Sequence, residues 1–219
     1  MNRKILSLLL ALCLLLSLTA CGDAEPDAPD VPDAPGQGDS VQPAADGGDE
    51  SWAIYWYLCG SDLEGDGGFA TDDLAELMEV ELPEHVTVVI QTGGASTWWN
   101  DLIDAEKLQR WVYDSQGLTL VDEQPSASMG EASTLADFLA FANENYPASR
   151  KAVLFWNHGG GSVSGAAFDE LYDLDSLTLD EMYAAFSSVW QENAAQPPLE
   201  LIGFDTCLMA TVDVAHGFS

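Results

Sequence analysis

Short apolar runs alternate with helical patterns along the chain after residue 50. Continuous apolar runs are typical of buried parallel strands, whereas apolar residues spaced three and four apart indicate amphipathic helices. Their alternation favours an α/β fold, with a mostly parallel sheet and helices on both faces. We predict strands at 52–59, 86–91, 152–157 and 199–204, a hairpin of strands 107–114 and 118–122, and helices at 71–79, 134–146, 179–191 and from residue 208 to 214.

Polar and capping residues set the borders of these elements. Residues 60–68 are polar and glycine-rich, so we expect them to form a loop. Thr71 and Thr178 are at the starts of segments with a helical pattern and are candidate N-caps. Pro83 and Pro147 stop the first two helices, because proline cannot continue a helix.

Two of the predicted strands lead into reactive side chains. The third runs into His158 and Gly159, and the fourth runs into Cys207. The carboxyl ends of parallel strands meet at one edge of a sheet, where α/β proteins bind ligands. An imidazole and a thiol at that edge are the minimum for a cysteine nucleophile with a general base. Cys207 also precedes the helix predicted from Leu208, and a helix N-terminus would stabilise its thiolate.

Each of these residues also has a purely structural interpretation. A histidine can be a hydrogen-bonded core residue, and a free cysteine is often a small buried hydrophobe. Their occurrence together on matched strand ends favours the catalytic interpretation. Cys59 belongs to the first strand and is interpreted as structural, with a disulfide to Cys207 as the less favoured alternative. His85 and His216 are interpreted as incidental.

The N-terminal region has a different composition from the rest. A basic pair followed by a short apolar stretch makes residues 1–20 typical of a secretory signal. The Leu-Thr-Ala-Cys sequence that ends at Cys21 resembles a bacterial lipobox, which implies diacylation of Cys21 and anchoring to the extracytoplasmic face of the bacterial cell membrane; an ordinary cleaved signal is the alternative. Residues 21–50 are rich in Asp, Pro, Ala and Gly and predict a disordered tether, followed by a folded domain over 51–219.

The charge of the chain restricts its partners. Acidic residues outnumber basic ones by 37 to 6, which gives a net charge of −31. Such a chain cannot neutralise phosphates, so nucleic acid is excluded as a partner. The field favours cationic partners such as peptides that contain Lys or Arg, although surface acidity also serves solubility by itself.

Four segments carry a family resemblance: Tyr57–Gly65, Phe155–Gly159, Asp175–Met182 and Gly203–Ala210. Together they resemble the clostripain-type cysteine peptidases, over a stretch from about residue 52 to the end. The resemblance implies a caspase-like three-layer sandwich in which the catalytic histidine precedes the cysteine. The separation of 49 residues between His158 and Cys207 agrees with the caspase spacing of about 50.

The resemblance also implies roles for single residues. Cys207 would be the nucleophile, His158 the general base and acid, and the N–H groups of Gly159 and Cys207 the oxyanion hole. Asp205 precedes the nucleophile by two residues and is a candidate to bind a basic substrate side chain, with capping of the following helix as an equal alternative.

Calcium is the one cofactor that the resemblance implies, because some relatives require it. The loop carboxylates of this chain lack the spacing of a calcium-binding loop, so we favour solvated charge and assign no metal ligands. The carboxylates in question are Asp62, Glu64, Asp66, Asp169, Asp173 and Asp175.

Two features depart from the family pattern. Relatives often mature by cutting themselves after a basic residue between the two catalytic segments, but no Lys or Arg follows Lys151. The sequence also stops 12 residues after Cys207, before the further strands that normally complete such a sheet. We therefore expect no self-processing in that region and a fold truncated after the strand that carries the cysteine.

The leading hypothesis is a lipid-anchored cysteine endopeptidase that cleaves proteins or peptides through a Cys–His dyad and an acyl-thioester. The resemblance implies cleavage after Arg or Lys. A non-catalytic acidic surface lipoprotein that binds cationic peptides or ligands is the alternative from another class. A thiol amidase that acts on cell-wall peptides is the third hypothesis.

Overall fold

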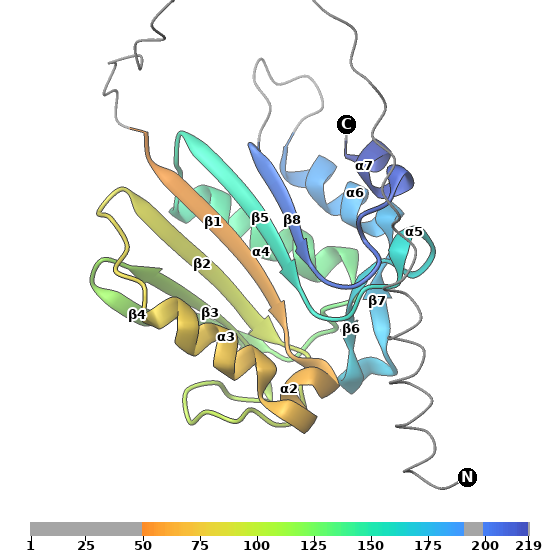
Figure 1. Ribbon diagram of the computed structural model, residues 1–219, viewed down its shortest axis with the longest axis horizontal. Helices are drawn as coiled ribbons and strands as arrows, with labels where there is room; N and C mark the ends of the chain where they lie inside the picture. The colour runs from red at the N-terminus through yellow and green to blue at the C-terminus, as the bar shows by residue number, and fades with distance from the viewer. Residues whose placement is uncertain (1–49, 191–198, 219) are drawn as a thin grey trace, which may run out of the picture. The chain divides into compact units, whose positions relative to one another are not determined.

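The computed structural model describes residues 50–190 and 199–218, which belong to one compact unit. The predicted signal peptide and nearly all of the predicted tether lie outside the described residues. The described part contains a six-stranded sheet in the order β4-β3-β2-β1-β5-β8 and a separate two-stranded sheet of β6 and β7 (Figure 1). The chain therefore has the α/β class that the sequence pattern predicts.

Four parallel strands form one side of the large sheet, and each coincides with a predicted strand. A strand that is buried on both faces needs apolar side chains at nearly every position, which is why the runs at 52–59, 86–93 and 150–156 could be recognised. The run at 201–205 is also mostly apolar, although it is a partly exposed strand at the edge of the sheet. The remaining two strands form an antiparallel hairpin, also as predicted. The strands are β1 (Trp52–Cys59), β2 (Val86–Gly93), β5 (Arg150–Trp156) and β8 (Leu201–Asp205), with β3 (Lys107–Asp114) and β4 (Gly117–Pro125) in the hairpin.

Helices cover both faces of the sheet. Tyr57 of β1 belongs to the core beneath α4 (Ala132–Asn145) and α6 (Leu179–Val189). Its neighbour Leu58 belongs to the core beneath α3 (Phe69–Met78) on the opposite face. Figure 1 shows α3 on one side of the sheet and α4 and α6 on the other. These two buried clusters on either side of one sheet make three layers.

A capping box starts α6 where the sequence predicts it. The Thr178 hydroxyl accepts a hydrogen bond from the N–H of Glu181, and the Glu181 carboxylate accepts one from the N–H of Thr178. Two orphan N–H groups of the first turn are thereby satisfied, which fixes the beginning of the helix.

The segment after β1 differs from the prediction. The expected loop over 60–68 is wrong, because Ser61–Gly67 form the short helix α2. Gly68 ends α2 in the left-handed conformation that glycine favours. The expected cap at Thr71 is also wrong, because α3 begins at Phe69 and Thr71 lies inside it.

A small substructure follows β5 and contacts β1, β5 and α2. Its elements are α5 (Gly161–Ser164), β6 (Ala166–Asp169), the 3-10 turn η1 (Glu170–Tyr172) and β7 (Asp175–Leu177).

No helix among residues 50–190 and 199–218 has the length and apolar character needed to cross a membrane.

Candidate active site

The register of β5 and β8 aligns the two candidate catalytic segments. The strands are parallel, and their last paired residues are Trp156 and Asp205. His158 and Cys207 each lie two residues beyond that pair. This equal offset places the imidazole and thiol segments at one edge of the sheet, where the strand pattern predicts them.

Glycines after the histidine allow a close approach between the segments. A Cβ on Gly159 would overlap the carbonyl oxygen of Cys207, and it would lie 3.0 Å from Thr206 Oγ1. Gly161 has a φ of +68°, and a Cβ there would lie 3.3 Å from the carbonyl oxygen of Leu208. Only residues without a side chain fit both positions without displacement or strain.

Cys207 lies in an exposed turn and is a free cysteine. The helix predicted from Leu208 is wrong: Leu208 has a left-handed φ of 62°, and α7 (Val212–Gly217) begins later, after its N-cap Thr211. The argument that a helix N-terminus stabilises the Cys207 thiolate therefore does not apply.

The backbone donors expected in the oxyanion hole are available. The N–H groups of Gly159 and Cys207 form no hydrogen bond within the described residues. The neighbouring amide of Gly160 donates instead to Gly165 at 2.7 Å, which closes the bridge between this segment and β6. No hydrogen bond joins the His158 ring to the Cys207 thiol in the described part of the chain, and catalytic hydrogen bonds are often long before substrate binds.

Asn157 fixes the backbone just before the histidine. Its side chain is buried, its Nδ2 donates to the carbonyl of Cys59 at 2.8 Å, and its Oδ1 accepts from the N–H of Phe168 at 2.8 Å. The side chain thus connects the ends of β1 and β5 with β6. A buried amide with both ends satisfied rigidifies its surroundings, yet the sequence alone did not single out Asn157.

His158 has a carboxylate partner from a distant part of the chain. Its Nε2 lies 2.8 Å from Oδ1 of Asp62, a residue of α2 that is 96 positions earlier in the sequence. Both side chains are about half exposed, at 42% and 50%. On its other side the ring packs edge-on to Phe168, with 6.5 Å between ring centroids. Asp62 is therefore not one of the solvated loop carboxylates that the sequence led us to expect.

The contact changes the acidity of Asp62. Partial burial raises the pKa of this carboxyl, but the hydrogen bond from His158, the charge that this ring has when protonated, and hydrogen bonds from Ser61 and the Asp62 backbone together lower it by more. The net effect is a pKa below the ordinary carboxyl value, so Asp62 is ionised at neutral pH.

Two other carboxylates of the expected solvated group are buried and structural. Glu64 accepts hydrogen bonds from Thr71 and from the N–H of Trp99, and Asp169 accepts from the N–H groups of Met129 and Leu171. The described residues contain no group of three or more His, Cys, Asp or Glu side chains arranged to hold a metal ion.

Asp205 is exposed at the end of β8. The helix-capping alternative for this residue is wrong, because α7 is capped by Thr211. The strand also ends at Asp205, so the alternation of side chains along a strand does not extend to Cys207.

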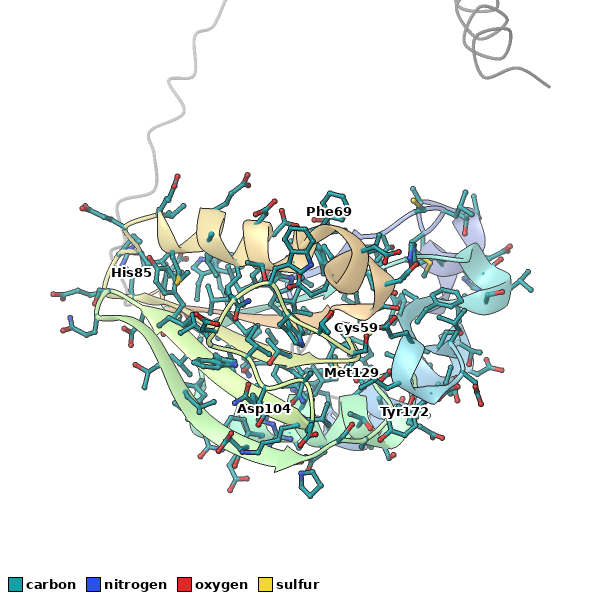
Figure 2. All side chains as sticks on the ribbon, turned by 90° about the horizontal axis from the view of Figure 1, so that it is seen from below. Cys59, Phe69, His85, Asp104, Met129 and Tyr172 are labelled. Carbon is teal, nitrogen blue, oxygen red and sulfur yellow. The ribbon has the colours of Figure 1, made fainter. Side chains whose placement is uncertain are left out.

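Cys59, the other cysteine of the described residues, lies beneath this arrangement, and neither His85 nor His216 belongs to it. Cys59 is a free, fully buried thiol that contacts the carbonyl of Phe168 at 3.4 Å, and Figure 2 labels it in the interior, near Met129. Burial, and then the charge of Asp169, raise the pKa of the Cys59 thiol well above its ordinary value. His85 lies before β2, at the opposite edge of the sheet, and His216 belongs to α7.

Comparison with known proteins identifies the family. The model of the clostripain family matches residues 56–218, and the chain therefore belongs to that family. The clostripain of Hathewaya histolytica is 28% identical over 98 residues, which cover 42% of this chain and 19% of that protein. The chain thus spans about a fifth of this curated relative.

Solved structures show the same fold. A secreted C11 cysteine protease from Bacteroides thetaiotaomicron, in complex with an irreversible peptide inhibitor, matches with a TM-score of 0.60 and 20% identity over 77% of this chain and 46% of that chain. An inactive zymogen C11 protease from Parabacteroides distasonis matches with a TM-score of 0.53 and 17% identity, over 77% and 45% of the two chains. This chain spans less than half the length of each.

Proposed function

We propose that this chain is a cysteine endopeptidase in which Cys207 is the nucleophile and His158 the general base. The observation that carries the proposal is the equal offset of the two residues from the last β5–β8 pair, together with the packing of Gly159 against the backbone of Cys207. Membership of the clostripain family supports the same roles. Proteins or peptides are the substrates that such a family implies.

The residues present account for each step of amide hydrolysis. His158 takes the proton of the Cys207 thiol, and the thiolate attacks the peptide carbonyl carbon to form a C–S bond. The N–H groups of Gly159 and Cys207 bind the oxyanion, typically with about 3–4 kcal/mol per donor. The imidazolium then gives its proton to the amine as the C–N bond breaks. Water, deprotonated by His158, hydrolyses the thioester and releases the acid.

Hydrolysis of fluorogenic peptides tests this function. We expect the unmodified chain to release the reporter from a peptide, and Cys207→Ala and His158→Ala each to lose the activity. Cys59→Ala serves as the matched thiol control and should keep it. Equal hydrolysis by Cys207→Ala would contradict the mechanism. A Cys207 that reacts with iodoacetamide no faster than free cysteine would favour the alternative, a non-catalytic acidic protein that binds cationic peptides.

We further propose that Asp205 favours Arg or Lys before the cut bond. Its carboxylate is exposed at the end of β8, beside the turn that carries Cys207, and a carboxylate is the natural partner of a guanidinium. Asp205→Asn should raise KM for an Arg reporter and leave a norleucine reporter unchanged. Glu200→Gln, at the other end of β8, is the control for loss of charge. Equal effects on both reporters would argue against a specificity role.

The location of the protein is a separate proposal. The Leu-Thr-Ala-Cys sequence supports lipid anchoring through Cys21 on the extracytoplasmic face of the bacterial membrane. Cells that make the full chain should incorporate radiolabelled palmitate into it and retain it in the membrane fraction, and Cys21→Ser should abolish both. Palmitate incorporation that persists in Cys21→Ser would contradict the assignment.

A further inference from the structure

We propose that Asp62 is a positioning residue for His158: it holds the proton on Nε2 of the ring and leaves Nδ1 as the atom that exchanges protons with the Cys207 thiol. The inference deepens the proposed peptidase function and rests on it. Nothing in the strand pattern around His158 or Cys207 points to this residue, which comes from α2.

The tautomer follows from the chemistry of the contact. An ionised carboxylate has no proton to give and can only accept. Because Asp62 is ionised at neutral pH and its Oδ1 lies 2.8 Å from Nε2, that nitrogen must be the donor. A neutral imidazole carries a single N–H, so its Nδ1 then has a free lone pair. This is the form that a general base must have.

The backbone around Asp62 is held in a strained conformation. Ser61, which begins α2, has a left-handed φ of 50° although it is not glycine. Such a residue is unfavourable and persists only where the surroundings determine it. Strain of this kind concentrates at functional sites, and here it immediately precedes the carboxylate that contacts His158.

Hydrogen bonds made by Glu64 and Trp99 supply the restraint. Glu64 is fully buried two residues after Asp62, and it accepts from the Thr71 N–H at 2.8 Å and from the Trp99 N–H at 2.7 Å. Trp99 in turn donates its ring N–H to the carbonyl of Gly65 at 3.1 Å. These bonds attach α2 to α3 and to the loop after β2. Asp62 is thus presented by a rigid element, as a positioning residue requires.

Asp62 neither gains nor loses a proton in any step of the proposed reaction. The thiol proton moves from Sγ to Nδ1 and gives a thiolate and an imidazolium, which the carboxylate stabilises. When the C–N bond breaks, the same proton moves from Nδ1 to the leaving amine. Nε2 keeps its proton at every stage, and the carboxylate remains the acceptor.

Kinetics of matched variants test the role. Asp62→Asn should lower kcat by roughly 10²–10⁴-fold, because its amide can donate to Nε2 and favour the wrong tautomer. Asp62→Glu keeps the charge and should recover part of the loss. Asp66→Asn, an exposed carboxylate of the same helix, removes an equal charge and should leave kcat within twofold. Equal kcat in Asp62→Asn and Asp66→Asn would overturn the proposal.

A spectroscopic measurement separates this proposal from the peptidase function itself. ¹⁵N NMR of the His158 ring should show the Nε2–H tautomer in the unmodified chain and in Asp66→Asn, and a shift toward Nδ1–H in Asp62→Asn. An unchanged tautomer in Asp62→Asn would contradict the positioning role even if the chain cleaves peptides. A chain that cleaves no peptide contradicts the peptidase function, and the tautomer still decides whether Asp62 controls the ring.

Discussion

The Cα of Gly159 packs directly against the carbonyl oxygen of Cys207. This contact joins the two segments through their backbones, without help from a side chain. The spacing between imidazole and thiol is therefore set by how closely two strand extensions approach each other. A backbone contact of this kind tolerates no added atom at position 159.

Gly159→Ala should force the two segments apart. We expect a loss of about 1–3 kcal/mol of unfolding free energy from overpacking and a fall in kcat of roughly 10²-fold from misplacement of the reacting groups. Gly217→Ala is the matched control, because no atom lies within 4 Å of a Cβ at that position. Urea denaturation and reporter hydrolysis measure the two effects. Unchanged stability and activity in Gly159→Ala would show that the segments are further apart than described.

Glu64→Ala should be the most destabilising change in α2. It removes a fully buried side chain and leaves the N–H groups of Thr71 and Trp99 without their carboxylate acceptor, which we expect to cost about 1–3 kcal/mol. Glu64→Gln retains one acceptor oxygen and should cost less. Glu76→Ala, an exposed glutamate of α3, should change stability by under about 0.5 kcal/mol. Similar midpoints of urea unfolding for Glu64→Ala and Glu76→Ala would contradict this account.

Asp62 should titrate below the ordinary carboxyl range, and His158→Gln should move its pKa back upward. A carboxyl whose folded pKa is depressed contributes stability above its unfolded pKa and loses it as pH falls through the folded pKa. The pairing with His158 should therefore persist through neutral and mildly acidic pH and disappear only in strong acid. The ¹³C shift of the Asp62 carboxyl, followed against pH in both chains, measures the change. Identical titrations would disprove the coupling.

The two cysteines of the domain should differ strongly in reactivity. Cys207 is exposed, whereas Cys59 is buried and its pKa is raised. Iodoacetamide at pH 8 should therefore label Cys207 in the native protein and label Cys59 only after unfolding. Peptide mapping by mass spectrometry locates the label. Rapid labelling of native Cys59 would contradict the burial of β1.

Strands β1, β2 and β5 could be predicted because burial on both faces requires consecutive apolar side chains. Strand β8 is a partly exposed edge strand, and it could be predicted because its sequence is mostly apolar as well. The start of α6 could also be predicted, because the two residues of its capping box, Thr178 and Glu181, lie within four residues of each other. The sequence pattern failed to predict the short helices correctly. Helix α2 contains Gly65 and Gly67, which disfavour helix, and it is held by the distant contacts of Glu64.

Only part of the candidate site could be predicted from the sequence. His158 and Cys207 stand at the ends of apolar runs, where a sequence pattern can indicate them. The turn after Cys207 could not be predicted. Leu208 and Met209 both have high helix propensity, whereas the backbone of Leu208 adopts the left-handed conformation. The carboxylate partner of His158 lies 96 positions away, and only the packing of α2 against the sheet edge brings it near.

The pairing of β8 with β5 also determines when the segments of His158 and Cys207 come together. Of the described strands, β8 is the last to emerge during synthesis, and it carries Cys207 to a histidine that was made 49 residues earlier. Until the two strands pair, an emerging or unfolded chain holds the thiol and the imidazole in no fixed geometry. Any chemistry that needs both groups in one arrangement would therefore depend on the pairing of β8 with β5.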